Sequence, residues 1–364
     1  MQLLKIDCLG RELRLEGSMA GWQALYWDNQ LVSQHDANAD PSSSSVHSFQ
    51  LKAGEQELNC VLQLELTWQP FALSYSLQLS DGLRDELISQ GERSEKDIEA
   101  QVIEARPKQP NKVSWLGIGS LGLKLFKSAK VLKVLFAAGS LAAYTWLFSI
   151  QFAIALILCL VFHEYGHIRA MKRFGLKTKG IYLIPFVGGL ALSDDRINTR
   201  WQDVYISIMG PFFGLLLSCA CLLVYWLTGM ELFAGLAAFN ALLNLFNLLP
   251  VLPLDGGHIL KSIAFSVNSV IGLVCCALGA IAGVALSYYF NMTLLGFLLA
   301  IGSIEIVFEW KRRHISDLLP LDRYGQIVSA LWYFSTVGGL CAVIWVLAQS
   351  GNEALALPMK ILGS

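Results

Sequence analysis

Hydrophobic positions along the chain follow two different patterns. In the first third, residues 62–68 alternate strictly between apolar and polar side chains, and residues 71–79 place their larger apolar side chains at every second position. A period of two puts the apolar side chains on one face of a strand, so the two segments predict a β-hairpin. Shorter runs of the same kind, separated by Gly, Asn and a Ser-rich loop, extend the prediction to a soluble β-rich domain over residues 1–92.

The rest of the chain carries long apolar runs. Seven of them are long enough to cross a bilayer as helices. They occupy residues 131–149, 151–173, 204–228, 232–250, 268–290, 293–310 and 329–348. The predicted fold class is therefore a polytopic α-helical membrane protein, with about six or seven transmembrane helices and a small N-terminal β-rich cytoplasmic domain.

The segment between these two parts has a mixed composition. Residues 93–130 contain charged and proline residues, followed by apolar side chains interleaved with Lys124, Lys127 and Lys130. We interpret the segment as a linker with a juxtamembrane amphipathic stretch on the lipid surface. A specific lipid or substrate site is the alternative. The membrane domain then covers residues 131–348, and residues 349–364 form a tail.

Basic residues give the expected orientation in the membrane. Lys and Arg gather at every second connection, as in the segment from Arg169 to Lys179, whereas the turns near residues 150, 229 and 291 contain neither. Because basic loops stay in the cytoplasm, this alternation places the N-terminus there, and the C-terminus outside if there are seven spans. The first residues lack the features of a secretory signal peptide, which agrees with a cytoplasmic N-terminus.

Composition narrows the class of protein. Hydrophobic residues make up 54% of the chain and charged residues only 15%, and the mean hydropathy is +0.51. These values indicate an integral membrane protein with the lipid bilayer as its partner. The net charge of −1 supplies no global basic field, so nucleic acid is not an expected partner.

Candidate chemistry lies inside the second apolar run, in the sequence His163-Glu164-Tyr165-Gly166-His167. Residues four apart share one face of a helix, so both imidazoles can reach one metal ion while Glu164 lies beside a metal-bound water. With zinc, the metal polarises a scissile carbonyl and Glu164 acts as the base. Ionisable side chains in so apolar a helix cost roughly 2.5 to 3.5 kcal/mol each unless they have partners, which favours a functional site.

Two histidines are too few ligands, and the best candidate for a third is Asp255. It lies in a segment from Asn247 to His258 that contains two prolines and two glycines, which we expect to break the helix. Non-helical backbone at membrane depth is tolerated only where it is buried in protein or lines a cavity, so the break itself indicates a site. On the predicted topology, Asp255 and the two histidines all lie in the cytoplasmic half.

Asparagines form a polar stripe on the helix that precedes this break. Asn240, Asn244 and Asn247 recur at helical spacing. Hydrogen bonding between helices is one explanation, and we favour it for Asn240. Asn244 and Asn247 are candidates for contact with a substrate, and Asn247 lies closest to the break.

The connection between the second and third spans contains a short apolar core. Residues 181–192 are too short and too rich in Gly and Pro to span, so we predict a re-entrant hairpin that includes Gly188 and Gly189. An exposed edge there could hold a substrate segment by strand addition. A plain surface loop is the alternative.

Together, the HExxH sequence in one span, Gly210-Pro211 in the next and the segment from Asn247 to Gly257 resemble the site-2 protease family of intramembrane metalloproteases, over roughly residues 130–265. The resemblance implies one Zn²⁺ per chain at His163, His167 and Asp255, with Glu164 as catalytic base. It also implies cleavage of membrane-embedded helices of single-span proteins, as in regulated intramembrane proteolysis, and suggests a bacterial inner membrane. Asn247 matches the asparagine of the family motif.

Several alternatives stay open at this point. His258 is an alternate ligand, a residue that supports a ligand, or a residue at an interface, and we favour the last two. A catalytically silent scaffold and a transporter are the rival functions, although a transporter should distribute polar residues over several helices or show an internal repeat. No residue pattern in the sequence predicts the identity of the substrate or the oligomeric state.

Overall fold

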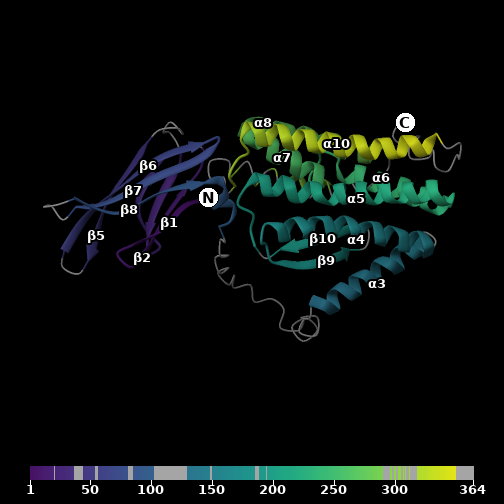
Figure 1. Ribbon diagram of the computed structural model, residues 1–364, viewed down its shortest axis with the longest axis horizontal. Coiled ribbons are helices and arrows are strands. Elements are labelled where there is room, and N and C mark those ends of the chain that lie inside the picture. The colour runs from purple at the N-terminus through teal and green to yellow at the C-terminus, as the bar shows by residue number, and fades with distance from the viewer. Residues whose placement is uncertain are drawn as a thin grey trace.

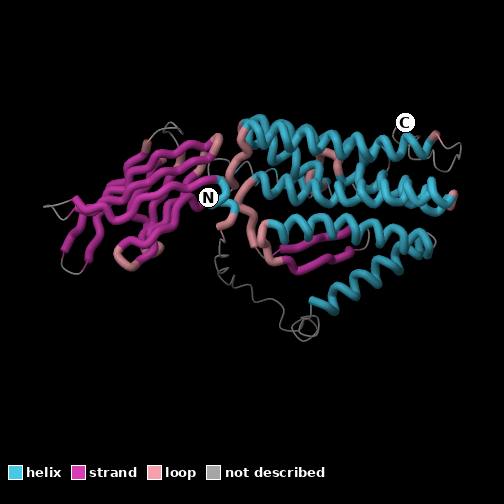
Figure 2. Tube along the Cα trace, in the orientation of Figure 1, coloured by secondary structure: helices cyan, strands magenta, loops and turns pink. Residues whose placement is uncertain are grey.

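The computed structural model describes most of the chain. The described residues are 1–19, 21–36, 44–53, 56–80, 85–101, 129–147, 150–184, 188–193, 195–289, scattered positions from 296 to 311, and 318–349. Strands gather at one end of the molecule and helices at the other, and one hairpin lies among the helices (Figures 1 and 2).

The N-terminal part, which we call the β-domain, contains two antiparallel four-stranded sheets that follow one another along the chain. The first is formed by β1 (Gln2–Cys8), β2 (Arg11–Gly17), β3 (Gln23–Trp27) and β4 (Gln30–His35). The second is formed by β5 (Ser45–Ala53), β6 (Gln56–Trp68), β7 (Phe71–Ser80) and β8 (Asp85–Ser94), and the helix α1 (Glu95–Glu99) follows it. The β-rich region is thus confirmed.

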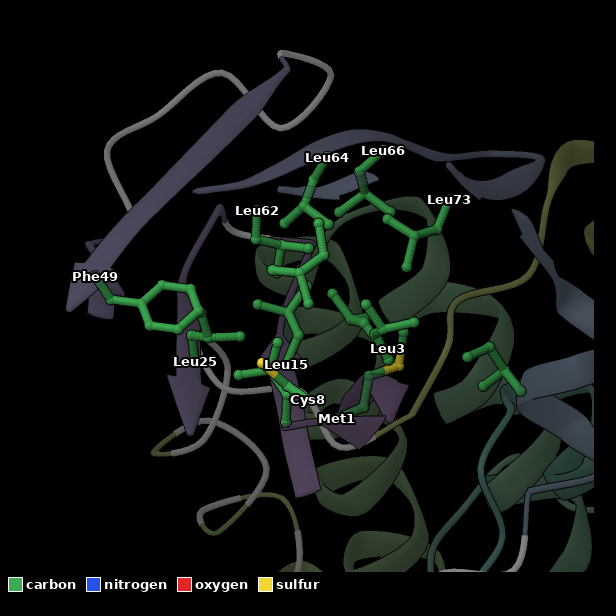
Figure 3. Close-up of a cluster of buried hydrophobic side chains, with 14 of the residues drawn as sticks. Met1, Leu3, Cys8, Leu15, Leu25, Phe49, Leu62, Leu64, Leu66 and Leu73 are labelled. Carbon is green, nitrogen blue, oxygen red and sulfur yellow. The ribbon is translucent and has the colours of Figure 1, made fainter. Parts of the chain in front are cut away.

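Alternating side chains build the core of the β-domain. On β6, Leu62, Leu64 and Leu66 are buried and pack with Leu3 and Leu15 of the first sheet (Figure 3). The intervening side chains are exposed, as a period of two requires. The predicted hairpin is present, since Trp68 pairs with Phe71 across the turn and the pairing continues along both strands.

Helices make up most of the remainder of the described chain. They are α3 (Ala129–Leu147), α4 (Ile150–Arg173), α5 (Arg200–Thr228), α6 (Glu231–Asn247), α7 (Asp255–Val267), α8 (Ser269–Tyr289) and α10 (Arg323–Ala348). Among the described residues, four of these helices have segments long and apolar enough to cross a membrane. They are Ala153–Arg173, Arg200–Thr228, Val270–Tyr289 and Arg323–Ala348.

The number of spans therefore stays a prediction. Helix α6 is 17 residues long, and the apolar helical segment within α3 covers Lys133–Ala143. Most of the predicted sixth span, 293–310, lies outside the described residues, as do residues 102–128 of the linker and residues 350–364 of the tail.

The break between α6 and α7 is shorter than expected. The helix ends at Asn247, but a new helix starts at Asp255, so Gly256 and Gly257 lie within its first turn rather than in a loop. A Cβ at Gly256 would come closer than 3.0 Å to the backbone carbonyl of Leu248. The two glycines thus serve close packing of α7 against the backbone of the break, which the sequence pattern alone does not reveal.

The predicted hairpin after the second span is present as β9 (Thr178–Ile184) and β10 (Gly188–Ser193), paired antiparallel. It lies between α3 and α4 (Figure 1). The Ser140 hydroxyl of α3 donates a hydrogen bond to the Leu183 carbonyl over 3.0 Å, and the Lys133 ammonium donates to the Lys179 carbonyl. Because both helices contact it, the hairpin has a fixed place beside α4.

Candidate metal centre

Helix α4 presents the HExxH side chains to its neighbours in the bundle. His163, Glu164 and His167 are all buried, with 3%, 5% and 7% of their surface exposed. The rings of His163 and His167 lie on one face because they are four residues apart, and their Nε2 atoms are 3.1 Å from each other. An apolar helix can bury so many polar atoms only if other elements supply partners.

Helix α7 brings a carboxylate to the two imidazoles. Oδ2 of Asp255 lies 3.2 Å from Nε2 of His163 and 3.5 Å from Nε2 of His167. Asp255 is the first residue of α7, where the helix N-terminus favours negative charge. One ligand atom from each of the three residues lies within 4.8 Å of the other two, so the three predicted metal ligands come together.

The Nδ1 atoms of both imidazole rings have hydrogen-bond partners, and these partners indicate which ring nitrogen carries the proton. Nδ1 of His167 is 2.7 Å from the backbone carbonyl of Ile206, which can only accept a hydrogen bond, so this nitrogen carries the proton. Nδ1 of His163 is 2.8 Å from Oδ1 of Asn244 and donates to it in the same way. In the neutral tautomers, both Nε2 atoms therefore present lone pairs to the centre.

A divalent cation fits this arrangement. Two imidazole lone pairs and a carboxylate oxygen converge without a proton between them, and Oδ2 of Asp255 is buried without a hydrogen-bond partner. Unless a cation is present, such a cluster leaves buried acceptors unsatisfied. Nitrogen and carboxylate ligands in a set of three are the donors that catalytic zinc sites use, with a further position left for water or substrate.

Glycines provide the room for the two rings. A Cβ at Gly210 of α5 would lie closer than 3.0 Å to Nε2 of both His163 and His167. A Cβ at Gly166 would collide with the carbonyl of Met209, so α4 and α5 also depend on glycine for their close approach. The Gly210-Pro211 pair is thus placed directly beside the predicted ligands.

A chain of buried amides extends behind His163. Asn244 donates from Nδ2 to the Asn240 carbonyl over 2.8 Å, and Asn240 donates to the Gly214 carbonyl and the Ser218 hydroxyl of α5. Both asparagines are fully buried. For Asn240, this is the expected hydrogen bonding between helices. For Asn244, the structure adds a contact with the His163 ring that the sequence pattern did not reveal, and its contact with a substrate stays a prediction.

The described contacts of Asn247 and His258 are with residues other than the three predicted ligands. Asn247 is half-buried and donates to the Leu243 carbonyl of its own helix over 3.3 Å. His258 points its Nδ1 toward Oδ1 of Asp203 on α5, at 3.8 Å, so it supports the packing of α7 on α5 and is not grouped with the metal ligands.

The base candidate Glu164 lies against strand β10. A Cβ at Gly189 would come within 3.0 Å of the Glu164 side chain, including its carboxylate. Gly189 pairs with Leu183, and the neighbouring Gly188 pairs with Ile184. The hairpin backbone therefore passes directly beside the catalytic candidate, where a side chain other than hydrogen would occupy the space.

Two contacts of the candidate metal centre could not be predicted from the sequence. The Ile206 carbonyl is a backbone group, and backbone acceptors leave no mark on residue type. The contact of Asn244 with His163 joins residues 81 positions apart, and helical spacing cannot tell a ligand support from a substrate contact.

Comparison with known proteins agrees with this geometry. Residues 151–236 and 228–290 match the model of peptidase family M50. A protein of Synechocystis sp., provisionally named a zinc metalloprotease, is 36% identical over 34% of each chain. The zinc metalloprotease MJ0392 of Methanocaldococcus jannaschii is 34% identical over 30% of this chain and 33% of its own. Stage IV sporulation protein FB of Bacillus subtilis is 25% identical over 47% of this chain and 63% of its own.

The similarity covers about a third of the length of the first two relatives. It includes the helices that carry His163, His167 and Asp255, and it stops short of the β-domain. Over residues 151–290, this chain is therefore similar to peptidase family M50, the site-2 protease family, and to relatives named as zinc metalloproteases.

Proposed function

We propose that this chain is a zinc-dependent intramembrane endopeptidase. The observation that carries the proposal is the arrangement around the buried HExxH side chains. The ligand atoms of His163, His167 and Asp255 lie together, and Glu164 lies beside them against the backbone of the β9–β10 hairpin. The relatives named as zinc metalloproteases support it. We propose one Zn²⁺ per chain, bound by His163, His167 and Asp255.

The chemistry assigned to the chain is peptide hydrolysis. Zinc bound here would polarise the scissile carbonyl and acidify the attacking water. Glu164 takes one proton from that water on its carboxylate, and the water oxygen forms the new bond to the carbonyl carbon. When the carbon–nitrogen bond breaks, Glu164 passes the proton to the leaving amine, so it returns to its charged form.

The substrates that we propose are membrane-embedded segments of single-span proteins. A peptide must be extended before its carbonyl can be attacked, and strand addition to the β9–β10 hairpin would provide that conformation beside Glu164. Asn247, near the break before α7, is a further candidate for substrate contact. Release of a regulatory factor, as in regulated intramembrane proteolysis, belongs to the same proposal.

We propose that the chain is an integral protein of a bacterial inner membrane. Four helices with the length and composition of spans support the membrane location. The proposed orientation has a cytoplasmic N-terminus, for the reason of charge distribution given above.

The test is cleavage of a panel of single-span substrates by the purified full chain in detergent, with zinc content measured alongside. We expect about one zinc per chain, cleavage that chelators abolish, and a loss of about 100-fold or more in Glu164→Gln, which should still hold zinc. Bound zinc with equal cleavage by wild type and Glu164→Gln would contradict the role of Glu164. A folded wild-type protein without zinc would contradict the whole site.

A further inference from the structure

The β-domain contacts the end of α7 that lies opposite the metal ligand. Gln69, in the turn between β6 and β7, donates from Nε2 to the carbonyl of Ser266 over 3.1 Å and to that of Leu321 over 3.0 Å. Ser266 is the next-to-last residue of α7, and Leu321 lies two residues before Arg323, the first residue of α10. A single amide of the β-domain thus joins two elements of the membrane part.

The bond to Ser266 satisfies a group that the helix cannot satisfy itself. The last four carbonyls of an α-helix have no partner within it, and the Ser266 carbonyl is one of these. The Ser266 hydroxyl also accepts a hydrogen bond from the Leu321 backbone N–H over 2.9 Å. The C-terminal end of α7, the segment before α10 and the β6–β7 turn therefore form one hydrogen-bonded junction.

The junction has a hydrophobic support as well. Leu319 is fully buried and belongs to the core of the β-domain, although it lies far along the chain. Its backbone pairs with that of Asn198 and Arg200, just before and at the start of α5. The Leu319 side chain of the membrane part thus packs into the β-domain core, and the Gln69 side chain of the β-domain bonds to the membrane part.

Helix α7 connects this junction to the metal centre. Asp255 is its first residue, and the helix is about 20 Å long. A tilt of a few degrees about its middle would move either end by roughly 1 Å. Metal–ligand distances vary by only about 0.2 Å, so the Asp255 carboxylate tolerates little tilt.

We propose that the β-domain positions Asp255 for metal binding through the contact of Gln69 with the C-terminal end of α7. Gln69 is a positioning residue in this scheme. The inference rests on the proposed metal site but adds a role for the β-domain, which lies outside the region that matches peptidase family M50.

A second contact between the two parts serves as the matched control. The Asn198 side chain donates to the carbonyls of Ile98 and Gln101 over 3.1 and 2.5 Å. Ile98 lies in α1 and Gln101 is the second residue after this helix, so the contact joins this region to the segment before α5. This contact holds the same two parts together without touching α7. Asn198→Ala should therefore loosen the β-domain without releasing the end of α7.

The experiment measures zinc affinity of the full chain by competition with a chelator, with the melting temperature of each variant recorded. We expect Gln69→Ala and Gln69→Glu to bind zinc about fivefold to tenfold more weakly, because neither can donate to the two carbonyls. Gln69→Lys, which restores a donor, should bind nearly as tightly as wild type. Gln63→Ala, an exposed position on the preceding strand β6, should have no effect.

The outcomes separate this inference from the proposed function. If wild type binds no zinc, the proposed metal site is wrong. If wild type binds zinc and Gln69→Ala binds it equally well, the positioning role is wrong. An equal loss in Asn198→Ala, or a loss in Gln69→Lys as large as that in Gln69→Ala, would also overturn it, because the effect would then reflect general loosening or an altered turn.

Discussion

At the scale of single residues, the orientation of His163 depends on one buried amide. Asn244 accepts from Nδ1 of the ring through its oxygen, and its nitrogen is held by Asn240, so the amide cannot rotate without losing a bond on each side. This arrangement keeps Nε2 of His163 directed at the centre. In the proposed metal site, Asn244 would act through the ring, because its oxygen contacts Nδ1 of His163 and not the Nε2 that faces the centre.

Replacing Asn244 by alanine should weaken zinc binding. The Nδ1–H of His163 would lose its acceptor in a buried site, and the ring would lose its fixed orientation. Partners of this kind are worth about 10-fold to 100-fold in metal affinity, so we expect a loss in that range for Asn244→Ala. Equilibrium competition with a chelator measures it directly.

Asn247→Ala is the matched comparison, one helical turn further on. Its amide bonds only to its own helix among the contacts described here, so zinc affinity should stay at the wild-type value while KM for a substrate rises. If Asn244→Ala left zinc affinity intact, the assignment of Asn244 as a support for His163 would be wrong.

At the scale of elements, the candidate metal centre depends on how closely the β9–β10 hairpin and helix α5 approach α4. Glycine at 189 lets strand β10 lie against Glu164, and glycine at 210 lets α5 lie against the two imidazoles. Neither position needs an unusual backbone conformation. In both cases the requirement is space for a side chain that we propose as catalytic base or metal ligand.

Gly189→Ala should therefore impair catalysis more than folding. The added methyl group must displace either β10 or the Glu164 side chain, so we expect cleavage to fall about 10-fold or more from misplacement of reacting groups. Zinc content should be retained, because Glu164 is not a proposed ligand. Single-turnover cleavage with a parallel zinc assay separates the two effects.

Gly235→Ala provides the control for a glycine change as such. Gly235 lies inside α6, and a Cβ there would meet nothing within 4 Å. The change should raise stability by about 0.5 to 1 kcal/mol, since alanine favours a helix interior over glycine, and leave cleavage unchanged. Equal activity of Gly189→Ala and wild type would show that the hairpin does not need its close contact with Glu164.

At the scale of the whole molecule, two parts of different construction are joined at one end of the helices (Figure 1). The β-domain is held by an apolar core between its two sheets, and the membrane part by helix packing around buried polar groups. Their stabilities should therefore respond to different conditions. Metal removal acts on the membrane part, and acid acts on the β-domain.

Zinc removal should lower the melting temperature of the membrane part. A ligand that binds only the folded state stabilises it by about 4 kcal/mol at 1,000 times its dissociation constant. We expect a fall in melting temperature on chelation and recovery when zinc is added back. Asp255→Asn should lose most of this response, and an identical response in that variant would contradict the ligand assignment.

Acid should destabilise the β-domain through His47. This side chain is fully buried between the sheets, with Nδ1 2.9 Å from the Ser33 hydroxyl and Nε2 2.9 Å from the Gln23 side-chain oxygen. Burial, with a smaller effect of the neighbouring His35, lowers the pKa of His47 from 6.5 to about 4. The neutral form is therefore the one that the fold accepts.

The sign of the pH effect follows from this direction. The unfolded chain takes up the proton near pH 6.5 and the folded chain only near pH 4, so the stabilisation is complete above pH 6.5 and is lost as pH falls toward 4. Between pH 7 and 5, the loss should be about 2 kcal/mol. Denaturant unfolding of wild type and His47→Gln at both pH values tests it. The variant should lose less, and equal losses would rule out His47 as the source.

Residue patterns alone were sufficient to predict the candidate metal ligands on α4 and the broad class of fold. Spacing within one element was sufficient to pair His163 with His167, because helical geometry repeats every 3.6 residues. Alternation was sufficient for the β6–β7 hairpin, since register along a strand follows the apolar face. Both are local properties, which a pattern of residues can encode.

Which groups come together from distant parts of the sequence became clear only from the three-dimensional fold. The approach of Asp255 to the imidazoles, the support of His163 by Asn244 and the contact of Gln69 with α7 join residues that lie 81 or more positions apart. The support of His163 by Asn244 could be inferred only once the two were seen in contact. The start of α7 at Asp255 likewise depends on glycines that pack against the backbone of the break, where local propensity alone favours a loop. Packing between elements decides such contacts, and no spacing along the chain records it.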